Sequence, residues 1–228
     1  MSFPNARLGV KILYHEAIVS MVFALVCLIE IICAAFNVSG PIQVTIRVLV
    51  IIALILSLVG IILKLLGVLK AAIDEPYFFK AFYVITFCAV FEIIGAFLDV
   101  ILDNEETIIY IMKTLGDISE AFVMTSVIGG LSKIFTRIGM PDLAKKDRNM
   151  CINIISLSII AILLEFIPIV VKATSETLRI IFTIFGIVSA AIEVLVCLNF
   201  QLFLKKVEKL FNNIPVSQPV EQKKAPTN

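Results

Sequence analysis

The sequence predicts an all-α membrane protein, a bundle of six transmembrane helices. Apolar residues make up 60% of the 228 residues and the mean hydropathy is +1.07, well above the roughly half-apolar composition of soluble domains. Several stretches exceed about 18 residues with very few charges, which is enough to cross about 30 Å of hydrocarbon. Helices of that length with apolar residues on every side are typical of membrane spans.

The first three spans are bounded by ordinary helix-breaking segments. Residues 17–36 form a run that is too long for a signal peptide and contains an acid, so we interpret it as a retained span. It ends before Asn, Gly and Pro in residues 37–41, and the second span follows at 44–69. An Asp-Glu-Pro segment at 74–76 separates it from the third span at 78–102.

The last three spans follow the same pattern. The fourth is predicted at 108–131 and the fifth at 151–171, with a Gly-Met-Pro-Asp segment at 139–142 between them. Residues 143–149 (LAKKDRN) are expected to form a short cytoplasmic helix leading into the fifth span. The sixth span is predicted at 178–204.

A change of composition near the C-terminus sets the predicted domain boundary. After residue 210 the chain is rich in Asn, Pro, Gln and Lys. Such a segment buries too little apolar surface to order itself. We therefore expect a transmembrane domain over residues 1–210 and a disordered cytoplasmic tail over residues 211–228.

The placement of basic residues predicts that both termini are cytoplasmic. Fifteen of the 19 Lys and Arg residues fall in segments that this arrangement places inside, and an excess of basic residues in short loops marks the cytoplasmic side. The Ile- and Lys-rich composition suggests the plasma (inner) membrane of a bacterium. The second span is almost wholly aliphatic, so we expect it to face lipid, with Lys64 and Lys70 reaching the inner headgroups.

Cysteine labelling tests this topology. Ser39→Cys and Asn104→Cys should react with a membrane-impermeant reagent from outside intact cells, because both positions lie in predicted outer loops. Lys145→Cys and Ser217→Cys should react only after the cells are opened. Labelling of the tail from outside would contradict the even number of spans.

Five glutamates within the predicted spans are the most informative polar residues. An acidic side chain in hydrocarbon costs at least a few kcal/mol, so such residues usually face the bundle interior and often mark function. Each of the five shares a helical face with small or polar residues, as closely packed membrane helices prefer. We therefore expect all five to point inward: Glu30, Glu92, Glu120, Glu165 and Glu193.

Glu92 is the leading candidate for a cation site. Its helical face continues through Gly95, Ala96 and Asp99 to the acidic loop that follows the third span, which would give a cation a path inward. No Lys or Arg is expected deep in any span. The acids must therefore be protonated, hydrogen-bonded or bound to a cation. The five glutamates and Asp99 are the predicted ligand- or cation-binding residues, and the sequence indicates no particular metal.

The odd-numbered spans also suggest an internal repeat. They read LIEIICA around Glu30, VFEIIGA around Glu92 and LLEFIPI around Glu165. This pattern suggests three tandem helical hairpins, each opening with a span that carries a glutamate. Ile- and Leu-rich helices also produce such matches by chance.

The chain lacks the motifs of the common membrane enzymes and cofactor sites. It has one histidine and no His-Glu-x-x-His, Gly-x-Ser-x-Gly or phosphate-binding loop. The five cysteines form no Cys-x-x-Cys pair, so neither a disulfide framework nor a zinc site is indicated. We expect no catalytic activity, no cofactor and no nucleic-acid partner.

Two functions are compatible with these features. The first is a small transporter or solute-binding membrane subunit whose acids bind a cation, a proton or a small cationic solute. The second is a membrane scaffold or accessory subunit in which the acids serve helix packing. Either could work with a partner membrane or cytoplasmic subunit within the lipid bilayer. The six-span layout is similar to that of the substrate-binding subunits of energy-coupling-factor vitamin transporters, in layout and not in motif.

Overall fold

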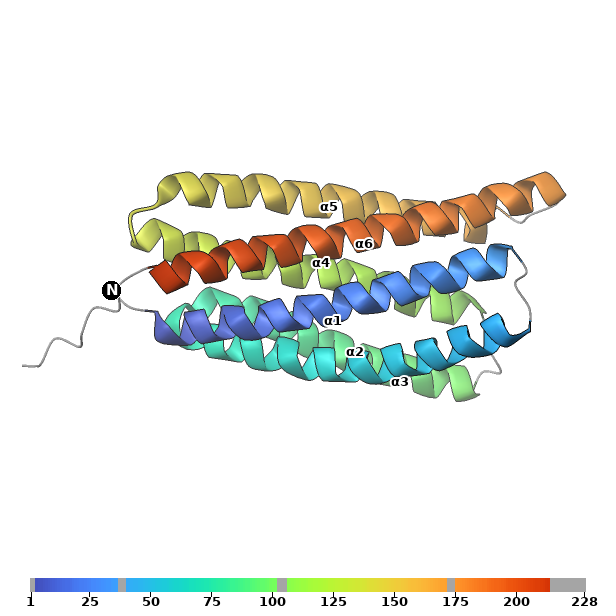
Figure 1. Cartoon of the computed structure of the whole chain (residues 1–228), viewed down its shortest axis with the longest axis horizontal. Coiled ribbons are helices and arrows are strands. Elements are labelled where there is room, and N and C mark those ends of the chain that lie inside the picture. The colour runs from blue at the N-terminus through green and yellow to red at the C-terminus, as the bar shows by residue number, and fades with distance from the viewer. Residues whose placement is uncertain (1–2, 37–39, 102–105, 172–174, 214–228) are drawn as a thin grey trace, which may run out of the picture.

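Six long α-helices and one short 3-10 helix make up the part of the chain that the structure, a computed structural model, describes (Figure 1). That part comprises residues 3–36, 40–101, 106–171 and 175–213, without the side chains of residues 41, 43, 54, 91–101, 106–113, 169 and 170. No strand occurs in these ranges. The elements are α1 (Pro4–Ala35), α2 (Pro41–Asp74), η1 (Pro76–Phe78), α3 (Phe79–Ile101), α4 (Glu106–Arg137), α5 (Pro141–Val170) and α6 (Glu176–Asn213).

Five of these helices, all except α3, are long and apolar enough to cross a membrane. The side chains of α3 are described only as far as Val90, and this shorter portion is also apolar. The all-α prediction is thus confirmed, as is the presence of helices suited to a membrane. That α3 crosses the membrane as a sixth span is part of the proposed topology below.

The helices extend beyond the predicted spans at the end that carries the chain's N-terminus. α1 begins at Pro4, α5 begins at Pro141 and is continuous through residues 143–149, and α6 runs to Asn213. Residues 143–149 are therefore helical, as expected, and form the first turns of α5 rather than a short helix of their own. These extensions are held by burial, because apolar side chains on them pack into the core. Buried examples are Ala6, Val10, Leu13, Val207 and Phe211, and Leu143 and Met150 of α5 are partly buried against the core.

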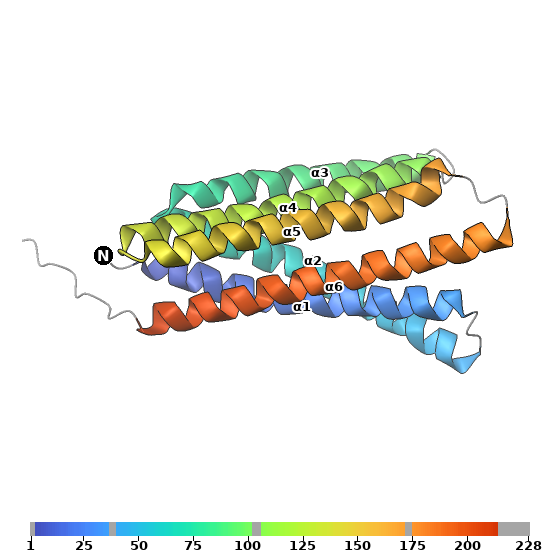
Figure 2. The same cartoon turned by 90° about the horizontal axis from the view of Figure 1, so that it is seen from above.

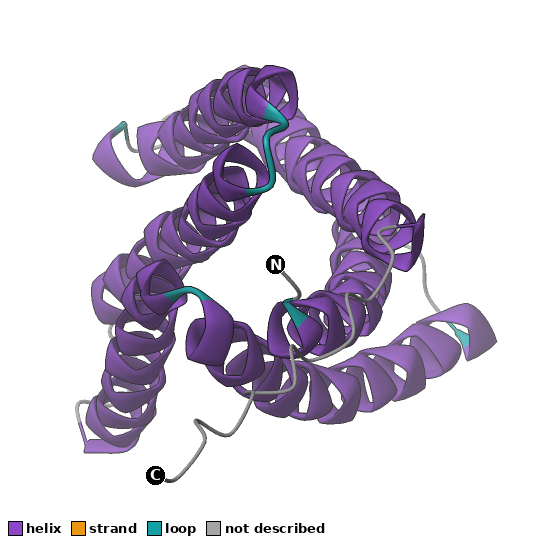
Figure 3. Cartoon of the chain, turned by 90° about the vertical axis from the view of Figure 1, so that its left-hand side faces the viewer, coloured by secondary structure: helices purple, strands orange, loops and turns teal. Residues whose placement is uncertain are grey.

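The helices form a ring in chain order. Each helix packs against the next, and α6 packs against α1, which closes the ring (Figure 3). Successive helices run in opposite directions (Figure 1). The three predicted hairpins are therefore present as packed pairs, α1 with α2, α3 with α4, and α5 with α6. Their relation as repeats stays a prediction.

The two ends of the ring differ in packing. At the N-terminal end, Asp74 of α2 accepts hydrogen bonds from Asn5 Nδ2 (3.0 Å) and from the Ala6 backbone N–H (2.8 Å) at the start of α1. Arg137 of α4 forms an ion pair with the buried Glu75 at 2.8 Å. Toward the other end, α1 and α2 diverge from α3, α4 and α5 (Figure 2).

A close approach between α1 and α2 depends on Gly9. A Cβ placed there would lie 2.5 Å from the Gly67 carbonyl oxygen and 2.8 Å from the Ala71 nitrogen, both backbone atoms. Gly9→Ala should therefore push the two helices apart and destabilise the protein by about 1–3 kcal/mol. Gly60→Ala is the matched control, because its Cβ would first meet Val19 Cγ1 at 3.4 Å. Thermal unfolding in detergent compares them, and equal stability of the two variants would contradict the close approach.

Candidate functional site

A cavity of about 630 Å³ lies inside the ring, with side chains from α1, α2, α4, α5 and α6 on its wall. Its charged lining consists of five carboxylates and one amine. Small lining residues, including three serines, leave space that larger side chains would otherwise fill. The charged and hydroxyl lining residues are Glu16, Ser20, Ser57, Lys64, Asp117, Glu120, Ser158, Glu165 and Glu193.

Lys64 forms an ion triad with two glutamates from other helices. Its Nζ lies 2.7 Å and 2.6 Å from the two oxygens of Glu120 on α4, and 3.1 Å from Oε1 of Glu16 on α1. Ser20, one turn after Glu16, donates a hydrogen bond of 2.7 Å to the same Glu16 oxygen. The Glu16 side chain is 2% exposed and that of Lys64 is 12% exposed. One amine thus compensates two acids within the bundle and connects α1, α2 and α4.

The position of Lys64 corrects the prediction for the second span. The outer face of α2 is aliphatic and exposed, as expected, but Lys64 does not reach toward the headgroups. Ser57, Gly60 and Ile61 share its helical face and also line the cavity. Ser57 and Gly60 are small and leave room for Lys64, and the two glutamates make an inward orientation favourable.

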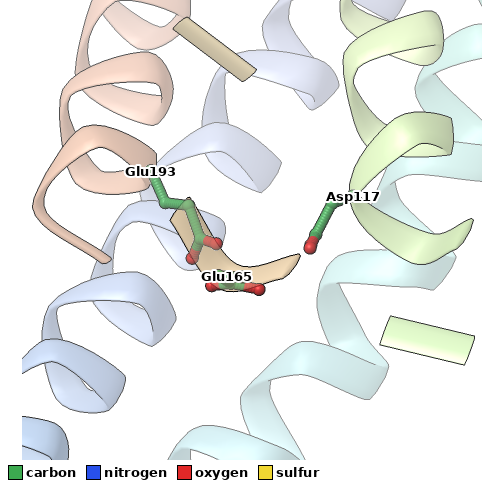
Figure 4. A group of neighbouring side chains, drawn as sticks. All are labelled: Asp117, Glu165 and Glu193. Carbon is green, nitrogen blue, oxygen red and sulfur yellow. The ribbon is translucent and has the colours of Figure 1, made fainter. Parts of the chain in front are cut away.

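Asp117, Glu165 and Glu193 form a second group, the carboxylate trio, on the same cavity wall. They come from α4, α5 and α6, and their carboxylates point toward one another (Figure 4). One oxygen from each lies within 4.8 Å of the others, and all three side chains are partly buried. This spacing is compatible with three oxygens that bind a single cation.

Ser189 positions one member of the trio. Its side chain is fully buried, and Oγ lies 3.0 Å from Glu165 Oε1 and 3.1 Å from the Ala161 carbonyl oxygen. A hydroxyl has a single proton to donate. It can donate to the carboxylate, or it can donate to the carbonyl and accept a hydrogen bond from a protonated Glu165. The site can therefore hold Glu165 in either protonation state.

The three carboxylates of the trio repel one another when they are ionised. Two ionised carboxylates about 5 Å apart repel each other by a few kcal/mol at the effective dielectric constant of about 20 that fits protein sites. Three such groups therefore need compensation by a proton, a basic side chain or a bound cation. The cavity beside them is large enough for a bound cation.

The structure brings together three of the six predicted site residues. Glu120, Glu165 and Glu193 all line the cavity, whereas Glu30 is exposed and does not. Glu30 lies near the end of α1, where α1 diverges from α4 and α5 (Figure 2). Its predicted inward orientation does not bring Glu30 to the cavity, although Cys27 and Ile31 of the same helix line it. The side chains of Glu92 and Asp99 lie outside those that the structure describes.

Three charged residues of the cavity were missing from the prediction: Glu16, Lys64 and Asp117. Glu16 precedes the predicted start of the first span, and Lys64 was assigned to the membrane surface. The omission of Glu16 follows from a span start set one residue too late, and that of Lys64 from orienting its side chain toward the headgroups. A signal was present, because Glu16, Ser20 and Cys27 share one face of α1 and all three line the cavity.

Comparison with known proteins provides no family for the chain. No protein-family model, no curated protein and no solved structure matches it.

Proposed function

We propose that this protein is a small membrane transporter, or the solute-binding subunit of one, whose interior cavity binds a small organic cation. The observation that carries this proposal is the convergence of Asp117, Glu165 and Glu193 within 4.8 Å on the wall of a cavity of about 630 Å³. A cation in the cavity would compensate the mutual repulsion of the three acids. Buried acids in membrane helices often mark the pathway of a substrate or ion.

The cavity favours an organic cation over a bare ion. Its volume of about 630 Å³ falls in the range of about 300–1,000 Å³ typical of small-molecule sites. Apolar side chains, including Phe23, Ile31 and Ile162, face the same space as the acids. An ammonium group with an apolar body would contact both kinds of surface. A metal ion bound by three carboxylate oxygens would use only the trio, and the donor set would suit Mg²⁺, Ca²⁺ or Mn²⁺.

The proposed topology has six spans with both termini in the cytoplasm. The N-terminus of α1 and the C-terminus of α6 lie at one end of the bundle (Figure 1). Exposed basic residues gather on the helix ends there, among them Lys11, Lys145, Lys205 and Lys209. Such residues suit the anionic inner leaflet of a plasma membrane. A bacterial origin and a partner subunit are likewise part of this proposal.

The ion triad favours the scaffold alternative for part of the site. Lys64 compensates Glu16 and Glu120 without any ligand, so these two acids have a sufficient structural role. The scaffold alternative extends that role to the trio and predicts that no ligand occupies the cavity. The two functions therefore differ in whether cations stabilise the protein.

A ligand-stabilisation experiment with matched pairs tests the proposal. The purified protein is heated in detergent with small alkylammonium and guanidinium ions, and with the neutral alcohol or amide of the same shape. We expect at least one organic cation to raise the unfolding temperature while its neutral counterpart does not, because ligands that bind only the folded state stabilise it by mass action. Mg²⁺, Ca²⁺ and Mn²⁺ form the metal arm. If no cation stabilised the protein more than its neutral counterpart, the proposal would be wrong.

A further inference from the structure

A second cavity, of about 430 Å³, lies between α5 and α6 beside the C-terminal part of α4. It shares no lining residue with the first cavity. It lies along the first turns of α5 and the last turns of α6, which are the most polar and basic parts of those helices. Under the proposed topology this is the depth of the cytoplasmic headgroups.

Asp147 is the unusual residue of this cavity. It lines the cavity from α5, yet the residue is only 5% exposed. Its Oδ2 is buried and has no hydrogen-bond partner among the described residues. Glu75 Oε2 is also buried without a hydrogen-bond donor, but Arg137 lies 2.8 Å from it as an ion-pair partner. Lys206 is close enough for its charge to act on Asp147, but it makes no hydrogen bond to this oxygen. Buried carboxylate oxygens are normally satisfied, so Asp147 indicates a missing hydrogen-bond donor.

The rest of the cavity offers complementary chemistry. Lys206 on α6 and Lys146 on α5 also line it and are exposed, so their ammonium groups can reach an anion. Three amides, Asn149, Asn153 and Asn199, supply further hydrogen-bonding groups. The remaining wall is apolar, and it includes Phe203. A ligand that fits would combine a hydrogen-bond-donating cation, a neighbouring anion and an apolar body.

We propose that this cavity binds an aminophospholipid, whose primary ammonium donates to Asp147 and whose phosphate lies between Lys146 and Lys206. The acyl chains would follow the apolar wall toward the hydrocarbon. A quaternary ammonium has no N–H to donate, so a choline headgroup leaves the Asp147 carboxylate unsatisfied. The inference is independent of the cation proposed for the first cavity, since the two cavities have no residue in common.

The experiment compares lipids on the purified, delipidated full-length protein in detergent. Native mass spectrometry and thermal unfolding are measured with phosphatidylethanolamine, phosphatidylcholine and phosphatidylglycerol. Phosphatidylethanolamine should bind more tightly than the other two. Asp147→Asn should remove that preference, a loss of about tenfold or more, as expected for one hydrogen bond to a charged group. Lys206→Gln should weaken all phosphate-bearing lipids alike.

Matched controls lie on the same helices. Asp142→Asn changes an exposed acid in the first turn of α5, and Lys205→Gln changes an exposed lysine outside the cavity; both variants should behave as the wild type. Soluble phosphoethanolamine tests whether the ligand is a lipid or a soluble molecule with the same headgroup. Its binding at Asp147 would support the same ammonium and phosphate contacts with a soluble ligand. Equal affinity for ethanolamine and choline lipids in the wild type, or an unchanged preference in Asp147→Asn, would overturn the proposal.

Discussion

Lys64→Met is expected to destabilise the protein by about 3–5 kcal/mol, the usual cost of removing one partner of a buried ion pair. The reason is Glu16, which is 2% exposed and has Lys64 as its basic partner at 3.1 Å. Methionine keeps the length and apolar stem of the lysine, so lost charge rather than lost volume should dominate. Thermal or denaturant unfolding in detergent measures the change.

Two further variants distinguish the ion triad from a general effect of charge on α2. Lys70→Met removes an exposed lysine later on the same helix and should change stability little, because exposed charges contribute at most about 1 kcal/mol. Adding Glu16→Gln and Glu120→Gln to Lys64→Met should recover most of the loss, since uncharged replacements of a buried ion group are often neutral. A Lys64→Met variant as stable as the wild type would contradict the triad.

Glu193→Gln should weaken binding of the best organic cation by about 30-fold or more. Truncating one charge of a desolvated pair costs about 2 kcal/mol or more, and about 1.4 kcal/mol corresponds to a tenfold change in affinity. Glutamine keeps the shape of the side chain, so the fold should be retained. Equilibrium binding to the purified variant, with its unfolding temperature as a check on folding, measures the loss.

Glu30→Gln is the matched control for this prediction. It makes the same chemical change at a glutamate on α1 that is exposed and lies outside the cavity. Its cation affinity should equal that of the wild type. A similar loss in both variants would mean that the acids act through overall charge rather than through a defined site.

The fold was largely predictable because its causes are local in the sequence. Long apolar runs dictate helices in a membrane, and Pro and Gly segments mark their ends. The extensions of α1, α5 and α6 were less predictable, since the residues that hold them, such as Val10 and Phe211, become buried only when distant helices meet. Hydropathy alone reports the hydrocarbon-crossing portion of a helix.

The site was predictable only in part, for a related reason. Helical periodicity placed Glu120, Glu165 and Glu193 on inward faces, and the cavity contains all three. Periodicity gives the face of a residue but neither its depth in the bundle nor its partners. The pairing of Lys64 with Glu120 joins residues 56 positions apart, and the exposure of Glu30 follows from the divergence of whole helices. Both depend on tertiary structure.

The measurement that tests the central claim most directly is the pH dependence of organic-cation binding to the wild type and to Glu193→Gln. Cations bind ionised carboxylates and compete with protons. Lowering the pH returns protons to them, so the wild-type affinity should fall as the carboxylates become protonated, by up to about tenfold per pH unit when one proton is displaced. The dependence should be weaker in Glu193→Gln. An affinity that is independent of pH and equal in the two proteins would contradict cation binding at the carboxylate trio.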